Sequence, residues 1–516
     1  MPDDHGVFII YTGGTIGSLP KDRNDPASPL EPAPLEEIIQ KLPNYDNRDK
    51  KIFIKDEWIR LGTHTWEKPL DSSNITLADW KEMARVVKAN YDDYEGFVVL
   101  HGTDTLAYTA SALSFMLENL NKPVIITGSQ LPIARTRSDA VQNVVTAIEI
   151  AAAKTLGGTV VPEVSVLFRD YLFRGCRTAK LSASSFSGFA SPNYPPLATV
   201  GEHIDIQQHL IPERSGSQMN LRKKVSDNVT ILDVFPGMNA RILLSLAAEE
   251  GRGVLLRTYG MGTAPTSKPV LDALDSLTSA GKVVMNVTQA RSGRISTNED
   301  PVSLRLFEQG VISGVDMTSE AAYAKMVVLL SEHPDSDTVA DLLQIAECGE
   351  QSISVFNVHY EQGQTKESDD SENCSARLQR RKKVVGGHLL NSESIKNIKY
   401  IQLRLLGVEP VEKKKGAIPN RAIDFEVLLA DPAAELSDGR PSAQGLFSIK
   451  SDTLRWSSKT RPTINIAYDL TEHKNRLISP NDDIPSTILV LETNEPIRWK
   501  HLSILIYVSR IGESKI

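Results

Sequence analysis

The first 205 residues alternate short, wholly apolar runs with longer amphipathic stretches. The runs are VFIIYT, GFVVLHGT, KPVIITGS and VSVLFRD, and stretches such as TLADWKEMARVVKANYDDY and TLAYTASALSFMLENL lie between them. A strand that is apolar on both sides is buried on both sides, and helices between such strands are typical of a parallel sheet covered on both faces. The sequence therefore predicts an α/β domain over residues 1–205.

Small and hydroxyl-bearing residues follow three of these predicted strands, in YTGGT, HGTDT and TGSQLP. A single turn of this composition is ordinary turn or helix-capping chemistry. In open parallel sheets, however, ligands bind beyond the carboxyl ends of the strands. Three such ends in one sheet therefore predict one pocket to which all three contribute.

The rest of the chain divides into segments that differ in composition and in the spacing of their apolar residues. A polar linker at residues 206–227 precedes a second α/β unit at 228–360, with the runs NVTILDVF, GVLLRTYG and KVVMNVTQ. Residues 361–395 are polar and charged, which is typical of a flexible linker, and their basic RLQRRKK is read as a solvated charge run. From 396 to 512 apolar and polar residues alternate, which predicts an all-β, sandwich-like accessory domain.

Composition and charge narrow the class of protein. A net charge of −8 disfavours nucleic acid or an anionic membrane as the main partner. Cys176, Cys348 and Cys374 are scattered and lack zinc or disulfide spacing, which favours a reducing compartment. The start MPDDHGVFII is acidic where a signal peptide is basic, and its apolar run is too short to span a bilayer. We therefore expect a cytoplasmic protein.

The opening TGGTIG is neither a P-loop nor a GxGxxG motif. Two glycines after a strand allow close backbone approach and expose N–H groups that suit an oxyanion, and Thr15 beside them is a candidate nucleophile. A threonine hydroxyl needs help to react. Thr103 and Asp104 in HGTDT, with Lys180 in RGCRTAKLSASSFSG, are candidates for that role, although Lys180 alone is more typical of a surface ion pair.

The segment PLDSSN has two interpretations. Asp71, Ser72 and Ser73 could bind the charged ends of a small amino acid. The same residues are a good helix start, with Asn74 or Thr76 as the cap. Taken alone, the segment favours the cap.

The order of these motifs along the sequence is informative. YTGGTIG, DSSN, HGTDTLAYTASALSFML, ITGSQLP…RSDA and LFRGCRTAKLS, followed by RTYGMGTAP, NVTQARSGRIS and GVISGVDMTSEAAYAKM, resemble the bacterial-type L-asparaginases, most closely the cytosolic type I branch. The resemblance covers about residues 5–360 and leaves the carboxyl-terminal β region unrecognised. It implies a larger parallel-sheet domain plus a smaller α/β domain.

The resemblance also implies an activity, the hydrolysis of L-asparagine to L-aspartate and ammonia through an acyl-enzyme. Thr15 would be the nucleophile and Thr103, Asp104 and Lys180 the proton relay. The residues implied to hold the substrate are Gly14, Asp71, Ser72, Ser73 and Gly102. Neither a metal nor a cofactor is implied, and the assembly expected is a homodimer or homotetramer.

Differences from the family leave alternatives open. The loop SLPKDRNDPASPLEPAP lacks the usual tyrosine, Thr263 stands where the family has asparagine, and STNEDPVS replaces another usual segment. These changes bear on amine recognition and regulation. The alternatives are a glutaminase or other amidase on the same fold, a transamidation subunit, a lysophospholipase-like role, and a non-catalytic amino-acid-binding scaffold. The partner of the accessory domain is unknown.

Overall fold

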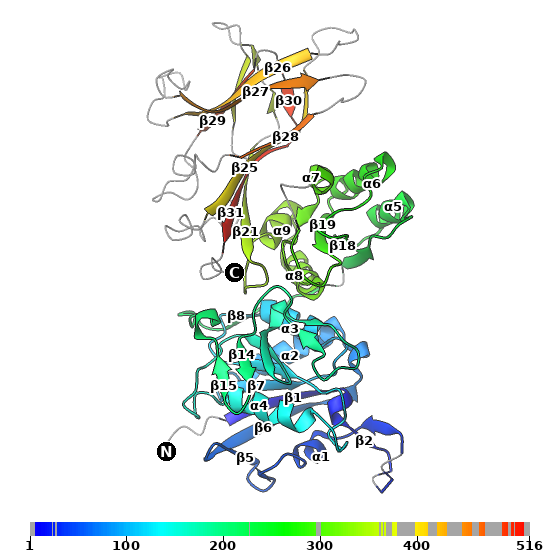
Figure 1. Cartoon of the computed structure of the whole chain (residues 1–516), viewed down its shortest axis with the longest axis vertical. Helices are drawn as coiled ribbons and strands as arrows, with labels where there is room; N and C mark the ends of the chain where they lie inside the picture. The colour runs from blue at the N-terminus through cyan, green and yellow to red at the C-terminus, as the bar shows by residue number, and fades with distance from the viewer. Residues whose placement is uncertain are drawn as a thin grey trace. The chain divides into compact units, whose positions relative to one another are not determined.

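The computed structural model of the chain describes residues 6–360 except 23, 26, 27, 227 and 296–300, and after residue 360 only the strands given below. The chain forms two compact units (Figure 1). The first comprises Met1–Val339 with Ala346–Gln351, and the second comprises Ala340–Ile345 with Ser352–Ile516. No helix in the described part of the chain is long and apolar enough to cross a membrane.

The larger sheet of the first unit is parallel at its centre. The four predicted runs form β1 (Gly6–Gly13), β7 (Tyr94–Leu100), β9 (Val124–Thr127) and β10 (Val164–Phe168), which are successive parallel neighbours. On the other side of β1 lies β6 (Glu57–Leu70), also parallel to it (Figure 1). All residues of β1, β9 and β10 are buried, so the predicted parallel sheet, buried on both faces, is confirmed.

Antiparallel strands extend this sheet on both sides. They are β4 (Tyr45–Asp46), β5 (Lys51–Ile54), β11 (Tyr171–Arg174), β14 (Ala198–Val200) and β15 (Ile204–Ile206). The full order is β15-β14-β11-β10-β9-β7-β1-β6-β5-β4. The carboxyl ends of β1, β6, β7 and β9 therefore lie next to one another at one edge, where a ligand site of such a sheet is expected.

Helices follow β6, β7 and β9 along the chain as the sequence predicts, but the helix after β7 is buried on every side and is therefore not amphipathic. The helices of this domain are α1 (Leu35–Ile39), α2 (Leu77–Ala89), α3 (Leu106–Met116) and α4 (Ala140–Ala151). Thr76 caps α2 in a capping box with Asp79, so Thr76 is the cap that the sequence offered as one choice. Residues on every side of α3 are buried, because it packs against α2, the sheet and helix α8 (Ser319–Glu332).

The second α/β domain of the first unit has a smaller, wholly parallel sheet. Its order is β17 (Val229–Asp233), β18 (Gly253–Thr258), β19 (Val283–Thr288) and β20 (Ile312–Ser313). Its helices are α5 (Ala240–Ala248), α6 (Lys268–Ser279), α7 (Pro301–Glu308) and α8. Buried residues of β18, β19 and α6 share one hydrophobic cluster, and the predicted smaller α/β domain is confirmed.

Short elements complete the first unit. The paired strands are β2 (Ser18–Pro20) with β3 (Leu30–Pro32), β8 (Leu117–Glu118) with β16 (Asn220–Leu221), and β12 (Ala179–Lys180) with β13 (Phe189–Ala190). The short helical turns are η1 (Thr15–Gly17), η2 (Ser72–Asn74), η3 (Gly175–Arg177) and η4 (Gln208–Leu210). Helix α9 (Ser336–Leu343) begins in the first unit and ends in the second.

Segment 346–351 is anchored in the first unit by a buried ion pair. Lys325 of α8 donates to Glu350 at 2.6 Å, and both side chains are 0% exposed. Burial alone would raise the pKa of Glu350, but the charge and hydrogen bond of Lys325, together with backbone N–H donors including that of Glu347, lower it to about 2. Removing one partner of such a pair would leave an uncompensated buried charge.

The described elements of the second unit after residue 352 are strands. They are β21 (Ile353–Tyr360), β22 (Gly363–Gln364), β23 (Lys366–Glu367), β24 (Cys374–Leu378), β25 (Ile398–Pro410), β26 (Arg421–Ala430), β27 (Leu446–Trp456), β28 (Ile464–Asp469), β29 (Ile488–Thr493), β30 (Ile497–Trp499) and β31 (His501–Ser509). The strand pairs that the structure describes here are antiparallel and fall into two sheets. Apart from β22, β23 and β24, the predicted linker 361–395 lies outside the described residues, and the domain boundaries and the sandwich arrangement stay predictions.

Candidate active site

Two glycines bring the ends of β1 and β7 into contact. Gly14 has a φ of 87°, which favours glycine, and its N–H donates to the carbonyl of Leu70 at the end of β6. A Cβ at Gly14 would lie 2.3 Å from the Cα of Gly102, so only two glycines can pass each other here. Thr15 and Thr103 each follow one of these glycines directly, which places two predicted site residues at the same sheet edge.

Lys180 joins the two predicted residues of the HGTDT turn. It lies on β12, and its Nζ donates to Thr103 Oγ1 at 2.8 Å and to Asp104 Oδ1 at 2.7 Å. The lysine side chain is 19% exposed and the aspartate 64%, so the group opens towards solvent on the Asp104 side. The structure thus brings Lys180 to two adjacent residues that lie more than seventy positions before it in the sequence.

The segment after β6 is tied to the same turn. Ser72 is buried, its Oγ accepts the N–H of Asp104 at 3.1 Å, and its carbonyl accepts the hydroxyl of Thr105 at 2.7 Å. Asp71 accepts both the N–H and the hydroxyl of Ser73, and these bonds lower the pKa of Asp71. Asp71 thus caps η2, and Ser72 is fixed beside Asp104, while the binding of a substrate by this segment stays a prediction.

The turn after β9, which is the third predicted strand end, is hydrogen-bonded to the loop that follows Lys180. Beyond β9, the side chain of Gln130 donates to the carbonyl of Ser185 at 2.8 Å, and Ser185 lies in the loop that follows Lys180. The carboxylate of Asp139 accepts the N–H groups of Gln130 and Leu131, which fixes the TGSQLP turn. This strand end therefore positions the loop on one side of the site.

Sequence reasoning missed Arg177, which anchors the loop ahead of Lys180. Arg177 is 0% exposed, and its Nε donates to the carbonyl of Gly349 at 2.7 Å and its Nη1 to Asp316 at 2.8 Å. A second arginine, Arg291, donates to the carbonyl of Lys180 at 3.4 Å. The signal available was the pair of arginines in RGCR, set among small residues, since an arginine there must find buried acceptors.

The two described cysteines of the first unit lie together at this anchor. The sulfur atoms of Cys176 and Cys348 are 3.6 Å apart, and both are free thiols. Burial, reinforced by the neighbouring thiol and by Glu350, raises the pKa of Cys348. A thiol of raised pKa is a poor nucleophile, so Cys348 is not expected to react as one.

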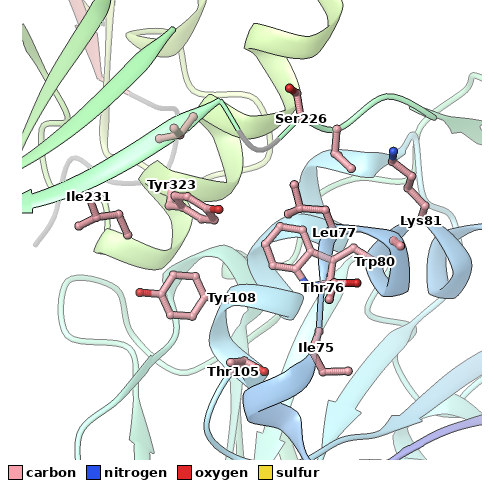
Figure 2. Close-up of a pocket in the computed structure, with 13 residues that line it drawn as sticks. Ile75, Thr76, Leu77, Trp80, Lys81, Thr105, Tyr108, Ser226, Ile231 and Tyr323 are labelled. Atoms are coloured by element: carbon pink, nitrogen blue, oxygen red, sulfur yellow. The ribbon is translucent and has the colours of Figure 1, made fainter. Parts of the chain in front are cut away.

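A cavity of about 840 Å³ lies beside the site (Figure 2). Its lining residues are Ile75, Thr76, Leu77, Ala78, Trp80, Lys81, Thr105, Tyr108, Val225, Ser226, Val229, Ile231 and Tyr323. This lining does not include Thr15, Thr103, Asp104 or Lys180. Within the described residues, no three His, Cys, Asp or Glu side chains are grouped as a metal site requires.

Two family models match the chain. The family models described as "Asparaginase, N-terminal" and "Glutaminase/Asparaginase C-terminal domain" match residues 6–212 and 228–343. L-asparaginase 1 of Escherichia coli (strain K12) is 38% identical over 64% of this chain and 94% of its own. The 60 kDa lysophospholipase of Mus musculus is 39% identical over 64% of this chain and 60% of its own.

A solved structure gives the same result for the fold. The crystal structure of L-asparaginase I from Vibrio cholerae has a TM-score of 0.59 and 36% identity, and the match covers 67% of this chain and 99% of that one. The large parallel sheet, the smaller α/β domain and the glycine-rich strand ends all lie within the matched region. The chain therefore belongs to the asparaginase family of enzymes.

Proposed function

We propose that the chain hydrolyses L-asparagine to L-aspartate and ammonia, with Thr15 as the nucleophile. The observation that carries this proposal is the position of Lys180 Nζ, within 2.8 Å of Thr103 Oγ1 and 2.7 Å of Asp104 Oδ1, beside the paired glycines. A binding protein has no need to keep a hydroxyl, a carboxylate and an amine in one hydrogen-bonded group at a strand end. A hydrolase needs such a group to move protons.

In the proposed reaction the Oγ of Thr15 adds to the carbon of the substrate's side-chain amide and gives its proton to the relay. The tetrahedral intermediate carries negative charge on oxygen, which backbone N–H groups beside the glycines stabilise. The C–N bond then breaks, and ammonia leaves with a proton from the relay. Water then gives a proton to the relay and attacks the carbonyl carbon of the resulting ester. The ester bond to Thr15 breaks, aspartate is released, and the Thr15 oxygen regains a proton from the relay.

The charged ends of the substrate fit the segment after β6. The lowered pKa of Asp71 keeps its carboxylate ionised, as binding an α-ammonium group requires. Ser72 and Ser73 supply hydroxyl groups for the α-carboxylate, and Ser72 is already bonded to Asp104. We also propose a cytoplasmic homo-oligomer, which light scattering on the purified protein and imaging of the tagged chain in cells test directly.

The first experiment measures ammonia release from L-asparagine by the full chain and by three variants. Thr15→Ala and Lys180→Met are expected to lower kcat by a factor of about 10³ or more, because they remove the nucleophile and the relay. Lys41→Met, at an exposed lysine of the same domain, is expected to match wild type. Wild-type release no higher than that of Thr15→Ala would contradict the proposal, and binding of asparagine without turnover would favour a scaffold.

Two further substrates belong in the same assay. L-glutamine is one methylene longer, a difference worth about 1–3 kcal/mol of discrimination, and one matching family model carries both names. A lysophospholipid is the other, because one relative is named a lysophospholipase. Fatty-acid release that Thr15→Ala does not abolish would point to chemistry elsewhere in the chain.

A further inference from the structure

His101 lies wholly inside the protein next to the predicted HGTDT turn. It follows β7 directly, is 0% exposed, and its Nδ1 lies 2.7 Å from the carbonyl oxygen of Gly102. Its Nε2 lies 3.0 Å from Oγ1 of Thr109 on α3. That hydroxyl oxygen is also 3.0 Å from Nε1 of Trp80 on α2. Three elements thus meet at one imidazole.

The chemistry of the partners fixes the direction of these hydrogen bonds. An indole N–H only donates, so the oxygen of Thr109 accepts from Trp80. A carbonyl oxygen only accepts, so Nδ1 of His101 carries a proton and donates to Gly102. In a neutral imidazole Nε2 is then the acceptor, and the single hydroxyl proton of Thr109 goes to it.

Burial keeps the imidazole neutral. Desolvation lowers the pKa of His101 to about 4, although the bond to Gly102 and the charge of Asp79 act in the opposite direction. With one proton on Nδ1 and none on Nε2, each of the three side chains meets the hydrogen-bonding need of its neighbour. The result is a chain of donors that runs one way, from Trp80 to Thr109, His101 and Gly102.

The hydrogen bond from Nδ1 of His101 to the Gly102 carbonyl fixes the peptide between Gly102 and Thr103. The described backbone contains no cis peptide bond, so the N–H of Thr103 points away from the Gly102 carbonyl and hence away from the imidazole. In the described part of the chain, no backbone carbonyl accepts this N–H. On the other side, Gly102 packs closely against Ser72, since a Cβ at Gly102 would lie 2.6 Å from Ser72 Oγ.

We propose that His101 is a positioning residue, which holds the Gly102 carbonyl so that the N–H of Thr103 is aimed at the oxyanion of the reaction. The inference rests on the proposed function. It assigns the imidazole no proton transfer: in this tautomer its one proton is bonded to a carbonyl and its free nitrogen is bonded to a hydroxyl. Trp80 and Thr109 are the supports that select the tautomer, and Trp80 also lines the neighbouring cavity (Figure 2).

Substitutions at His101 separate positioning from packing. In His101→Asn the amide nitrogen can take the place of Nδ1 and donate to Gly102, and kcat is expected to stay within about threefold of wild type. In His101→Leu the donor is lost, and kcat is expected to fall by about ten- to hundredfold at nearly constant KM, less than the ~10²–10³ for complete loss of an oxyanion donor. Equal kcat values for the two variants, each folded by circular dichroism, would overturn the proposal.

Two hydroxyls of α3 provide a matched comparison. Thr109→Val removes the hydroxyl that bonds Nε2 and is expected to lower kcat in the same direction as His101→Leu, by less. Ser111→Ala removes another buried hydroxyl of the helix, one that donates to the carbonyl of Ala107, and is expected to leave kcat unchanged. A loss of kcat in Ser111→Ala equal to that in Thr109→Val would assign the effect to helix packing and overturn the assignment.

Nitrogen NMR of the full chain labelled at histidine tests the tautomer without relying on a variant. The chain has ten histidines, and His101→Asn identifies the signal that belongs to this one. The expected spectrum shows a proton on Nδ1, none on Nε2, and no titration between pH 5 and pH 8. A proton on Nε2, or titration near the ordinary pKa, would overturn the inference even if asparagine is hydrolysed. If the wild-type protein shows this tautomer but does not hydrolyse asparagine, the proposed function is refuted instead.

Discussion

Gly14 and Gly102 face each other with no room for a side chain on either. We predict that Gly14→Ala loses at least tenfold in kcat/KM for asparagine, because its methyl group would meet the Gly102 backbone at 2.3 Å in a backbone with φ of 87°. Gly157→Ala is the matched control, since Gly157 also has positive φ, of 67°, but nothing lies within 4 Å of its Cβ position. The control should cost only about 1–2 kcal/mol of stability for the backbone strain. Ammonia release and thermal unfolding of both variants check this.

Asp71→Asn should raise KM far more than it lowers kcat. The carboxylate is held ionised by its bonds to Ser73 and faces no reacting bond in the proposed reaction. Loss of one charged contact corresponds to about 1.5–3 kcal/mol, or roughly a ten- to 150-fold rise in KM. A change confined to kcat would contradict a binding role.

Ser73→Ala should move the acid limit of activity. Its hydroxyl bond is one of the two bonds that lower the pKa of Asp71, so removing it lets that pKa rise towards the ordinary value. Asp71 would then lose its charge at a higher pH than in wild type, and kcat/KM would begin to fall earlier on acidification. The pH profile of kcat/KM for both proteins measures this, and identical acid limbs would disprove the link.

Glu350→Gln should destabilise the first unit by about 3–5 kcal/mol, because Lys325 would remain as an unpaired charge in the core. The exposed pair of Lys268 and Asp272, 2.7 Å apart on α6, is the control. Asp272→Asn should cost only about 0.3–0.5 kcal/mol there, since solvent screens the pair. Urea unfolding followed by fluorescence compares them, and equal costs would show that burial of the first pair has no effect.

His101 should make the protein less stable on mild acidification. Its pKa in the fold is about 4, below the ordinary 6.5, so the unfolded chain binds the extra proton between these values. Above pH 6.5 His101 is neutral in both states and does not lower the free energy of unfolding. As the pH falls from 6.5 to 4, protonation of the unfolded chain lowers that free energy by up to about 3 kcal/mol. His101→Asn should therefore show a flatter dependence of unfolding free energy on pH in this window than wild type. Parallel curves for the two proteins would refute the assignment.

The sequence predicts the central strands well, and it names three side chains that the structure brings into contact. β1, β9 and β10 are recognisable because buried parallel strands are apolar on both faces. β6 was not recognised, since its outer half alternates exposed and partly buried residues and carries charge. Thr103 and Asp104 stand out as an alcohol and a carboxylate at a strand end, but their contact with Lys180 depends on a fold that joins residues 76 and 77 positions apart.

Other site features depend on contacts that no local pattern encodes. Arg177 finds its acceptors at Asp316 and Gly349, 139 and 172 residues away. His101 belongs to a recognised motif, but its tautomer follows from two side chains on different helices. Thr76 was only one of two possible caps, and the capping box with Asp79 decides between them.

The burial of Glu350 has a consequence for how this protein can be cut and fused. The charge that neutralises Lys325 lies only one residue before Gln351, where the first unit ends. A fragment that stops after α9 would therefore lack the Glu350 carboxylate and leave Lys325 as an unpaired buried charge. A fragment that runs through Gln351 keeps the ion pair.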